Sequence, residues 1–273
     1  MKSRFLVLTL AIFMLGAMAA QADVVYSSIP SNVPPNVASL GYQATSTQEF
    51  GNAINLGGSA RQLTTVSVLM SNWALESTYE AVGTSTGYTH PLTFNIYDSL
   101  GSLLATDTIN ALIPWRPEAD PTCAGGTAWR AQDGNCYNGL ATTVTFDFTS
   151  QNITLPDSLI FGLAFNTETH GYNPLGVAGP YNSLNFGLEG GSPTVGTLIN
   201  PDSAYWNTSN AGFYTDGGAG GVSTFRQDTN WAPYAGQIEI NAVETPVPEP
   251  ASMMMFGTGL AGLAGVVRRK LKK

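Results

Sequence analysis

The chain has 273 residues, of which 43% are hydrophobic and 11% charged, and its formal net charge at pH 7 is -8. The charge is unevenly distributed, because the stretch between Phe5 and Val267 contains no lysine and sets four arginines against all nineteen acidic residues, a net charge of -15. Such a stretch repels nucleic acid and anionic lipid, which excludes partners of those classes. An acidic surface keeps an exported protein soluble, and the alternative is that it recruits cations or basic partners.

Residues 1–22 are predicted to be a signal peptide, cleaved before Asp23. The required parts are a positive start, an apolar run and small residues at the cleavage site, and these are Lys2 and Arg4, residues 5–17, and Ala20 and Ala22. Cleavage after Ala19 is a second option. An uncleaved membrane anchor fits less well, because the apolar run is short and small residues follow it at once.

Short runs of β-branched and aromatic residues separated by turns predict an all-β domain over residues 23–245. The expected strands cover residues 40–47, 63–73, 92–97, 103–109, 141–148, 158–166, 183–188 and 237–243. Apolar and polar residues alternate cleanly in 92–97 and 144–148, as in strands that bury one face. Residues 98–101 are expected to form a hairpin turn. Eight such strands without helices predict an antiparallel β-sandwich of jelly-roll type, with a barrel as the alternative.

Cys123 and Cys136 are the only cysteines. Because export places them in an oxidising compartment, we expect a disulfide that closes the long loop of residues 114–139 and stabilises it by about 3 kcal/mol. Metal binding by these thiols is the weaker alternative, since no histidine lies between them.

The sequence contains no recognisable catalytic constellation, metal motif or cofactor motif. Glu168 and His170 would share a face if they lay on a strand, but a solvated loop is the preferred interpretation. A glycosidase needs two carboxylates about 5 to 10 Å apart, and among nineteen acids some pair meets that distance by chance. We therefore predict a protein that is not an enzyme and needs no cofactor, with a glycoside hydrolase as a remote alternative.

Aromatic residues within polar loops are candidates for carbohydrate binding, because a ring covers the C–H face of a sugar while neighbouring polar groups bind its hydroxyls. Packing of the same rings in a small loop core is the preferred interpretation for any single residue. The candidates that lie near the expected disulfide or in a later loop are Trp115, Trp129, Tyr137, Tyr205 and Trp206.

The C-terminal tail has three parts. Residues 246–250 form a proline-rich spacer, residues 251–267 an uncharged run, and the end is a positive cluster of Arg268, Arg269, Lys270, Lys272 and Lys273. Seventeen helical residues would cover about 25 Å, within the range of a transmembrane helix. The positive-inside rule keeps the basic end, 268–273, in the cytoplasm and the domain outside.

These three parts resemble the PEP-CTERM sorting signal of exported proteins in Gram-negative bacteria. The resemblance rests on Val247, Pro248, Glu249 and Pro250, on the glycine-rich apolar run and on the arginine-containing end. Three methionines, 253–255, and the lysines at the end depart from the usual pattern. The resemblance implies that an exosortase, a membrane-bound processing enzyme, recognises Pro248, Glu249 and Pro250, and it associates such proteins with extracellular polysaccharide and biofilm.

Together these features predict an exported protein of the cell envelope, cell surface or extracellular matrix, held in the membrane by the tail helix before processing. Its expected role is structural or adhesive and linked to exopolysaccharide. The alternatives are a carbohydrate-binding module or a hydrolase acting on the same polymer.

Overall fold

The computed structural model describes residues 22–173, 175–176, 179–231 and 234–245. Strands dominate this part of the chain, and its helices are single 3-10 turns. The strands up to the middle of the chain are β1 (Asp23–Ser27), β2 (Ser39–Gly41), β3 (Thr47–Asn55), β4 (Gln62–Asn72), β5 (Tyr88–Tyr97), β6 (Leu103–Ile113), β7 (Trp129–Arg130), β8 (Cys136–Tyr137) and β9 (Leu140–Asp147). The later strands are β10 (Ser158–Phe165), β11 (Leu184–Glu189), β12 (Thr197–Leu198), β13 (Ser203–Thr208), β14 (Arg226–Thr229), β15 (Ala235–Gly236) and β16 (Ile238–Val243). The 3-10 turns are η1 (Glu76–Thr78), η2 (Thr149–Gln151), η3 (Pro180–Ser183) and η4 (Ala211–Phe213).

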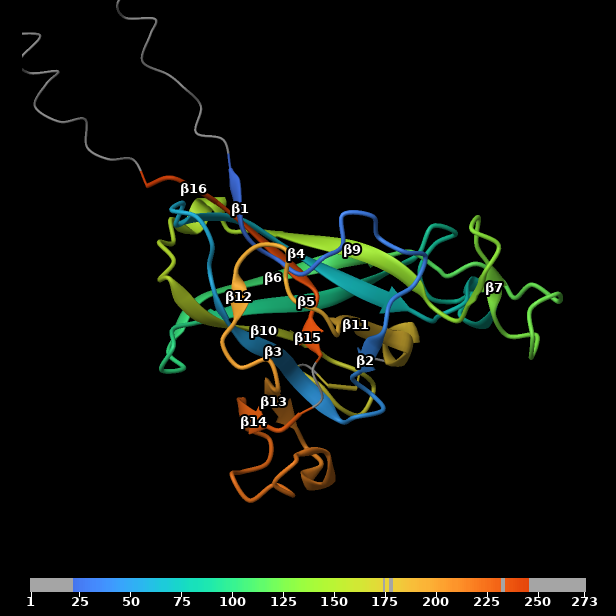
Figure 1. The fold of residues 1–273 in the computed structure, drawn as a ribbon. Coiled ribbons are helices and arrows are strands. Elements are labelled where there is room, and N and C mark those ends of the chain that lie inside the picture. The colour runs from blue at the N-terminus through green and yellow to red at the C-terminus, as the bar shows by residue number, and fades with distance from the viewer. Residues whose placement is uncertain (1–21, 174, 177–178, 232–233, 246–273) are drawn as a thin grey trace, which may run out of the picture.

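The strands form two antiparallel sheets of seven strands and a separate β7–β8 ribbon. In the first, here called sheet A, the order is β1-β16-β4-β11-β15, with β2 paired to β11 and β9 paired to β4. In the second, sheet B, the order is β14-β13-β3-β10-β5-β6, with β12 paired to β3. Figure 1 shows the long strands of the two sheets at the centre of the molecule and β7 on an arm that projects from it.

The two sheets share one hydrophobic core. Phe94 on β5 of sheet B and Phe146 on β9 of sheet A have ring centroids 5.6 Å apart. A second pair, Phe50 on β3 and Phe186 on β11, joins the sheets at 6.3 Å. Alternate residues along each strand point into this core, and the residues between them point to the outer face of their sheet.

The structure confirms the all-β class and the antiparallel pairing. The predicted strands at 63–73, 103–109, 141–148, 158–166, 183–188 and 237–243 correspond to β4, β6, β9, β10, β11 and β16, and 92–97 is the second half of β5. Residues 98–101 form the expected turn, in which the N–H of Gly101 donates to the carbonyl of Asp98 at 3.0 Å.

The predicted strand at 40–47 is wrong. The chain leaves β2 at Gly41, turns, and enters β3 at Thr47. Strand β3 lies in the middle of sheet B, yet its sequence lacks a clean alternation because Glu49 and Asn52 are buried on opposite faces. Because each face of β3 carries a polar side chain, its sequence lacks the alternation of apolar and polar residues from which strands are predicted.

The described chain begins and ends at the same end of sheet A, because Asp23 on β1 pairs with Ala242 on β16. Strand β4 starts at that end, where Gln62 pairs with Val243, and it finishes beside Leu140 of β9. Eleven residues of strand separate these ends by roughly 33 Å. The β7–β8 arm, which precedes β9, therefore lies at the end of the domain that is distant from the two chain ends (Figure 1).

No helix in the part of the chain that the structure describes is long and apolar enough to cross a membrane. The predicted helix at 251–267 lies outside the described residues, as do residues 1–21 and the tail from 246 onward.

Candidate functional site

The β7–β8 arm is closed by the expected disulfide. Cys123 and Cys136 are bonded, with their Cα atoms 5.9 Å apart. Arg130 joins two other parts of the same arm. Its Nε lies 3.2 Å from Asp120 Oδ2, and its guanidinium donates to the carbonyl of Gly134 at 2.6 Å. The long loop is therefore held by a covalent bond and by an ion pair at its surface.

The three tryptophans among the candidate carbohydrate-binding aromatics are buried, in line with the preferred interpretation that such rings pack inside the protein. Trp115 packs against Tyr88 at 4.9 Å, and its Nε1 donates to the carbonyl of Thr84. Trp129 donates to the carbonyl of Gly139 at 2.8 Å. Trp206 belongs to the hydrophobic core and is only 2% exposed. Each indole N–H has a protein partner, as buried tryptophans require, and each ring face is covered.

The two tyrosines of that set are partly exposed and lie apart from each other in the fold. Tyr137, on the arm, donates to Asp133 Oδ2 at 2.7 Å and contacts Trp129 at 5.9 Å. Tyr205, on β13 of sheet B, packs on Phe225 at 5.8 Å. Trp129 and Tyr137 are thus the one pair that the structure brings into ring contact within the set.

Glu168 and His170 lie in a tight turn, as the preferred interpretation has it. The N–H of Thr167 donates to the carbonyl of His170 at 2.6 Å, which folds the chain back on itself. Glu168 accepts from Asn182 at 3.3 Å, whereas His170 Nε2 lies 3.5 Å from the hydroxyl of Ser46. The two side chains therefore interact with different segments rather than with each other.

A buried carboxyl group that sequence reasoning missed lies on the outer face of sheet B. Glu49 extends from β3 across Gly162 of β10, where a β-carbon would overlap its Oε1. That oxygen accepts from Asn95 Nδ2 at 2.9 Å and from the Tyr97 hydroxyl at 2.8 Å, both on β5. Burial raises the pKa of the Glu49 carboxyl, and the two donors oppose that rise.

Rings cover the part of sheet B next to this carboxyl group. Phe225 lies between Tyr97 and Tyr205, with centroids 5.2 Å and 5.8 Å away. In the described part of the chain, no three His, Cys, Asp or Glu residues cluster closely enough to hold a metal ion. We interpret Glu49 as a structural residue whose hydrogen bonds connect β3 to β5, because both of its donors belong to the sheet itself.

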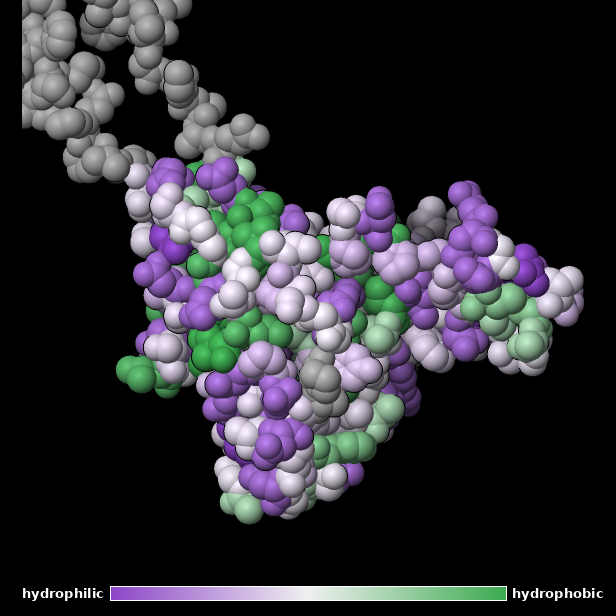
Figure 2. Space-filling model, in the orientation of Figure 1, coloured by the Kyte–Doolittle hydropathy of each residue, from purple (hydrophilic) through white to green (hydrophobic). Residues whose placement is uncertain are grey.

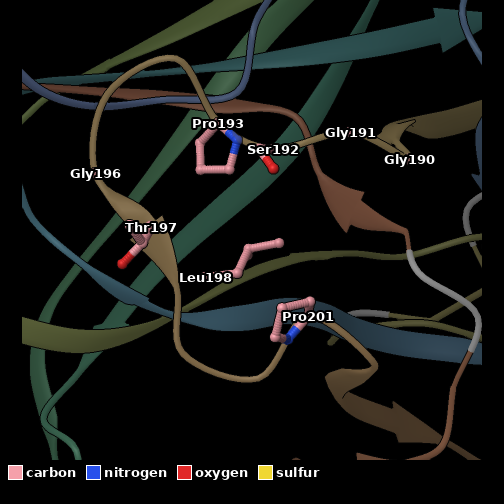
Figure 3. Close-up of a pocket in the computed structure, with 8 residues that line it drawn as sticks. All are labelled: Gly190, Gly191, Ser192, Pro193, Gly196, Thr197, Leu198 and Pro201. Carbon is pink, nitrogen blue, oxygen red and sulfur yellow. The ribbon is translucent and has the colours of Figure 1, made fainter.

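Two cavities adjoin the loop that follows β11. The first, of about 350 Å³, is enclosed by the curve of residues 190–201, with Pro193, Leu198 and Pro201 facing inward (Figure 3). Among the described residues that line it, none has a titratable side chain. The second, of about 420 Å³, lies beside it and contains Glu189 and Gln237 in its lining.

Comparison with known protein families finds the PEP-CTERM protein-sorting motif at residues 246–270. Searches of curated proteins and of solved structures found no match to this chain. The motif confirms the resemblance noted in the tail. It implies an exported protein at the cell envelope or surface that an exosortase-type enzyme processes.

Proposed function

We propose that this chain, which carries the PEP-CTERM motif, is a non-enzymatic protein of the cell surface or extracellular matrix of a Gram-negative bacterium. The observation that supports this proposal is the position of the motif. It starts at residue 246, three residues after β16 ends at Val243. Processing within the motif would therefore leave every strand of both sheets in the exposed domain.

The signal peptide at residues 1–22 belongs to the same proposal. Asp23 is the first residue of β1 and pairs with Ala242 of β16. Cleavage before Asp23 would therefore leave the whole of β1 in the mature protein. Ala20 lies outside the described residues.

We further propose that residues 23–245 form a single jelly-roll-like β-sandwich, with 246–250 as the spacer, 251–267 as the membrane helix before processing and 268–273 as its cytoplasmic end. The ring contacts between sheets A and B support one domain, because a shared core makes the two sheets interdependent. Both chain ends leave the domain together, so a tail in the membrane would point the disulfide-closed arm away from it.

The role that fits a domain exposed at the cell surface in this way is structural or adhesive, with exopolysaccharide of the biofilm matrix as the partner. All four arginines of the exposed domain bind within it: Arg61 to Asp157, Arg130 to Asp120, Arg226 to Asp216, and Arg116 to the carbonyl of Trp73. With its cations engaged and no lysine, the domain is better suited to a neutral polymer than to an acidic one.

Localisation of variants in a host with an active exosortase tests the sorting proposal. We expect the chain that lacks residues 246–273, and the Glu249→Ala variant, to be lost from the cell surface. Glu244→Ala is the matched control, because this acid lies just before the motif, and it should be sorted normally. Surface retention of the truncated chain would contradict the proposal.

A further inference from the structure

We propose that the 420 Å³ cavity on the outer face of sheet A binds one sugar residue of a neutral polysaccharide, with Gln237 as its main hydrogen-bond acceptor and Trp73 as a stacking surface at its rim. The cavity lies between β11 and the segment of residues 30–38, which crosses the outer face of the sheet. Two backbone bonds hold this segment: Leu188 N–H donates to Ala38 at 2.7 Å and Ala141 N–H to Pro35 at 2.9 Å. The cavity volume is in the usual range of small-molecule sites.

Gln237 is the feature that indicates a ligand. It lies on the outer face of the sheet, yet it is only 1% exposed. Its carboxamide lies over Gly187, where a β-carbon would come within 2.9 Å of Oε1. Its Nε2 lies 3.4 Å from Glu189 Oε2, whereas Oε1 is buried without a hydrogen-bond partner in the described part of the chain. An unpartnered buried acceptor costs about 1–3 kcal/mol, so a donor that enters the cavity would recover free energy.

The amide orientation that leaves Oε1 unpartnered has a physical reason. The neighbouring carboxylate of Glu189 accepts from Gly191 N–H at 2.7 Å through its other oxygen. An amide oxygen turned toward this carboxylate would repel it, so Nε2 faces Glu189 and Oε1 is left for a ligand.

Trp73 provides the apolar surface that a sugar ring requires. It is 44% exposed, and it is the one exposed residue among the five tryptophans. Its Nε1 donates to Ser71 Oγ at 3.0 Å, and that hydroxyl donates to Asn36 Oδ1 at 2.7 Å. Because Asn36 lines the cavity, this chain of bonds connects the indole to the cavity wall.

The backbone of Trp73 is also held on both sides, by Ser183 and Arg116. Its N–H donates to the carbonyl of Ser183 at 2.9 Å, and its carbonyl accepts from Arg116 Nε at 3.0 Å. An aromatic side chain held in this way loses little conformational entropy when it binds.

The lining selects the ligand class. The amides of Asn32 and Asn36, the carboxamide of Gln237 and the carboxylate of Glu189 offer acceptors for hydroxyl groups, while Pro30, Pro34 and Val37 supply apolar walls. The described residues that line the cavity include no lysine or arginine, so they offer an acidic sugar no counter-charge, and a single carboxylate is a poor cation site. A neutral pyranose combines hydroxyl donors with C–H faces, which complements this mixture.

This inference deepens the proposed surface role, and it relies on that role only for where the polymer is encountered. Binding is therefore measured on the full chain purified in detergent, apart from any sorting. The probes are maltohexaose, cellohexaose and chitohexaose as neutral glycans, an oligogalacturonate as an acidic one, and a basic peptide of similar mass. We expect at least one neutral hexasaccharide to bind and to change tryptophan fluorescence.

The variants Trp73→Ala and Gln237→Leu should each weaken that binding by about tenfold. The exposed aromatic Tyr172, which is not among the residues that line the cavity, supplies the control Tyr172→Ala, which should bind normally. Trp73 is 44% exposed, so we expect Trp73→Ala to fold even if Gln237→Leu does not. The absence of binding by any neutral hexasaccharide, preference for the acidic glycan or the peptide, or binding that neither variant weakens would each overturn the proposal. Failure of sorting in the localisation experiment would leave these results unchanged.

Discussion

The outer faces of the two sheets each bury a polar side chain over a glycine, and they do so with opposite outcomes. On sheet B, Glu49 lies over Gly162, and its Oε1 accepts two hydrogen bonds from β5. On sheet A, Gln237 lies over Gly187 and lines a cavity, and its Oε1 is buried without a partner in the described residues. A buried polar group that its own sheet satisfies holds the fold, whereas one left unsatisfied beside a cavity indicates a ligand.

The largest effect that we expect comes from replacing the glycine under Glu49. Gly162→Ala should lower the free energy of unfolding by roughly 3 kcal/mol, because the new methyl group takes the place of the carboxyl group and leaves its two donors unpaired. Urea denaturation measures the change.

The same substitution in a Glu49→Ala background should cost less than about 1 kcal/mol, since no carboxyl group remains to be displaced. If Gly162→Ala lowered the free energy of unfolding equally in the two backgrounds, the position of the Glu49 carboxyl group would not depend on the absence of a side chain at Gly162.

Acid should destabilise the protein through His90, a buried histidine on β5 of sheet B. Burial lowers its pKa from 6.5 to about 4, and its ring stacks on Tyr181 at 4.3 Å. Because the unfolded chain binds this proton at higher pH than the folded one, the stability contributed by neutral His90 is complete above about pH 6.5. It is lost as the pH falls toward 4, by roughly 3 kcal/mol. Thermal unfolding of His90→Phe over this range should show a weaker decline, and an unchanged slope would contradict the assignment.

Glu49 should act in the opposite direction over pH. Its pKa is raised by burial, so the folded state holds this proton more tightly than the unfolded state. Stability is therefore lost as the pH rises from the unfolded value near 4.5 through the folded one. The Glu49→Gln variant should lack this loss, and Gln237→Glu on sheet A should acquire one. Parallel unfolding curves for Glu49→Gln and the unaltered protein across the pH range would refute the interpretation.

The smallest effect on stability should come from sheet A. Gln237→Leu removes an acceptor that has no partner, so the free energy of unfolding should stay within about 1 kcal/mol or rise. On sheet B, Glu49→Leu should lower the free energy of unfolding by about 2 kcal/mol or more, because it leaves the donors of Asn95 and Tyr97 without an acceptor. Calorimetry on the two variants compares the faces directly, and a large loss at Gln237 would indicate that its oxygen is satisfied.

The features that were predicted correctly depend on neighbours in the sequence. The alternation in β9, Leu140–Asp147, follows directly from the residues, and this strand lies at the edge of sheet A with one face in the core. The disulfide needed only two cysteines at a short separation in an exported chain. Strand β3 was missed because Glu49 and Asn52 are polar on both faces, and their partners come from strands far away in the chain.

The aromatic candidates show the same limit. Trp115 and Trp206 are carbohydrate-binding candidates in the sequence because polar residues surround them, but Tyr88 and Phe50 from other strands cover them. Trp73 lies at the end of the apolar strand β4, and it is 44% exposed. Whether an aromatic ring is buried depends on which distant segment packs against it, and the hydropathy of its neighbours in the sequence does not predict that segment.

The sequence by itself determined the destination of this protein, its all-β class and its disulfide, because a sorting motif, a period of two and a pair of cysteines are local properties. Only the tertiary structure decided that Glu49 is satisfied, that Gln237 is not, and that Trp73 is the exposed indole. These outcomes depend on which segments lie against the outer faces of the sheets, and such contacts join residues far apart in the sequence, as with Glu49 and Tyr97 or with Gln237 and the 30–38 segment.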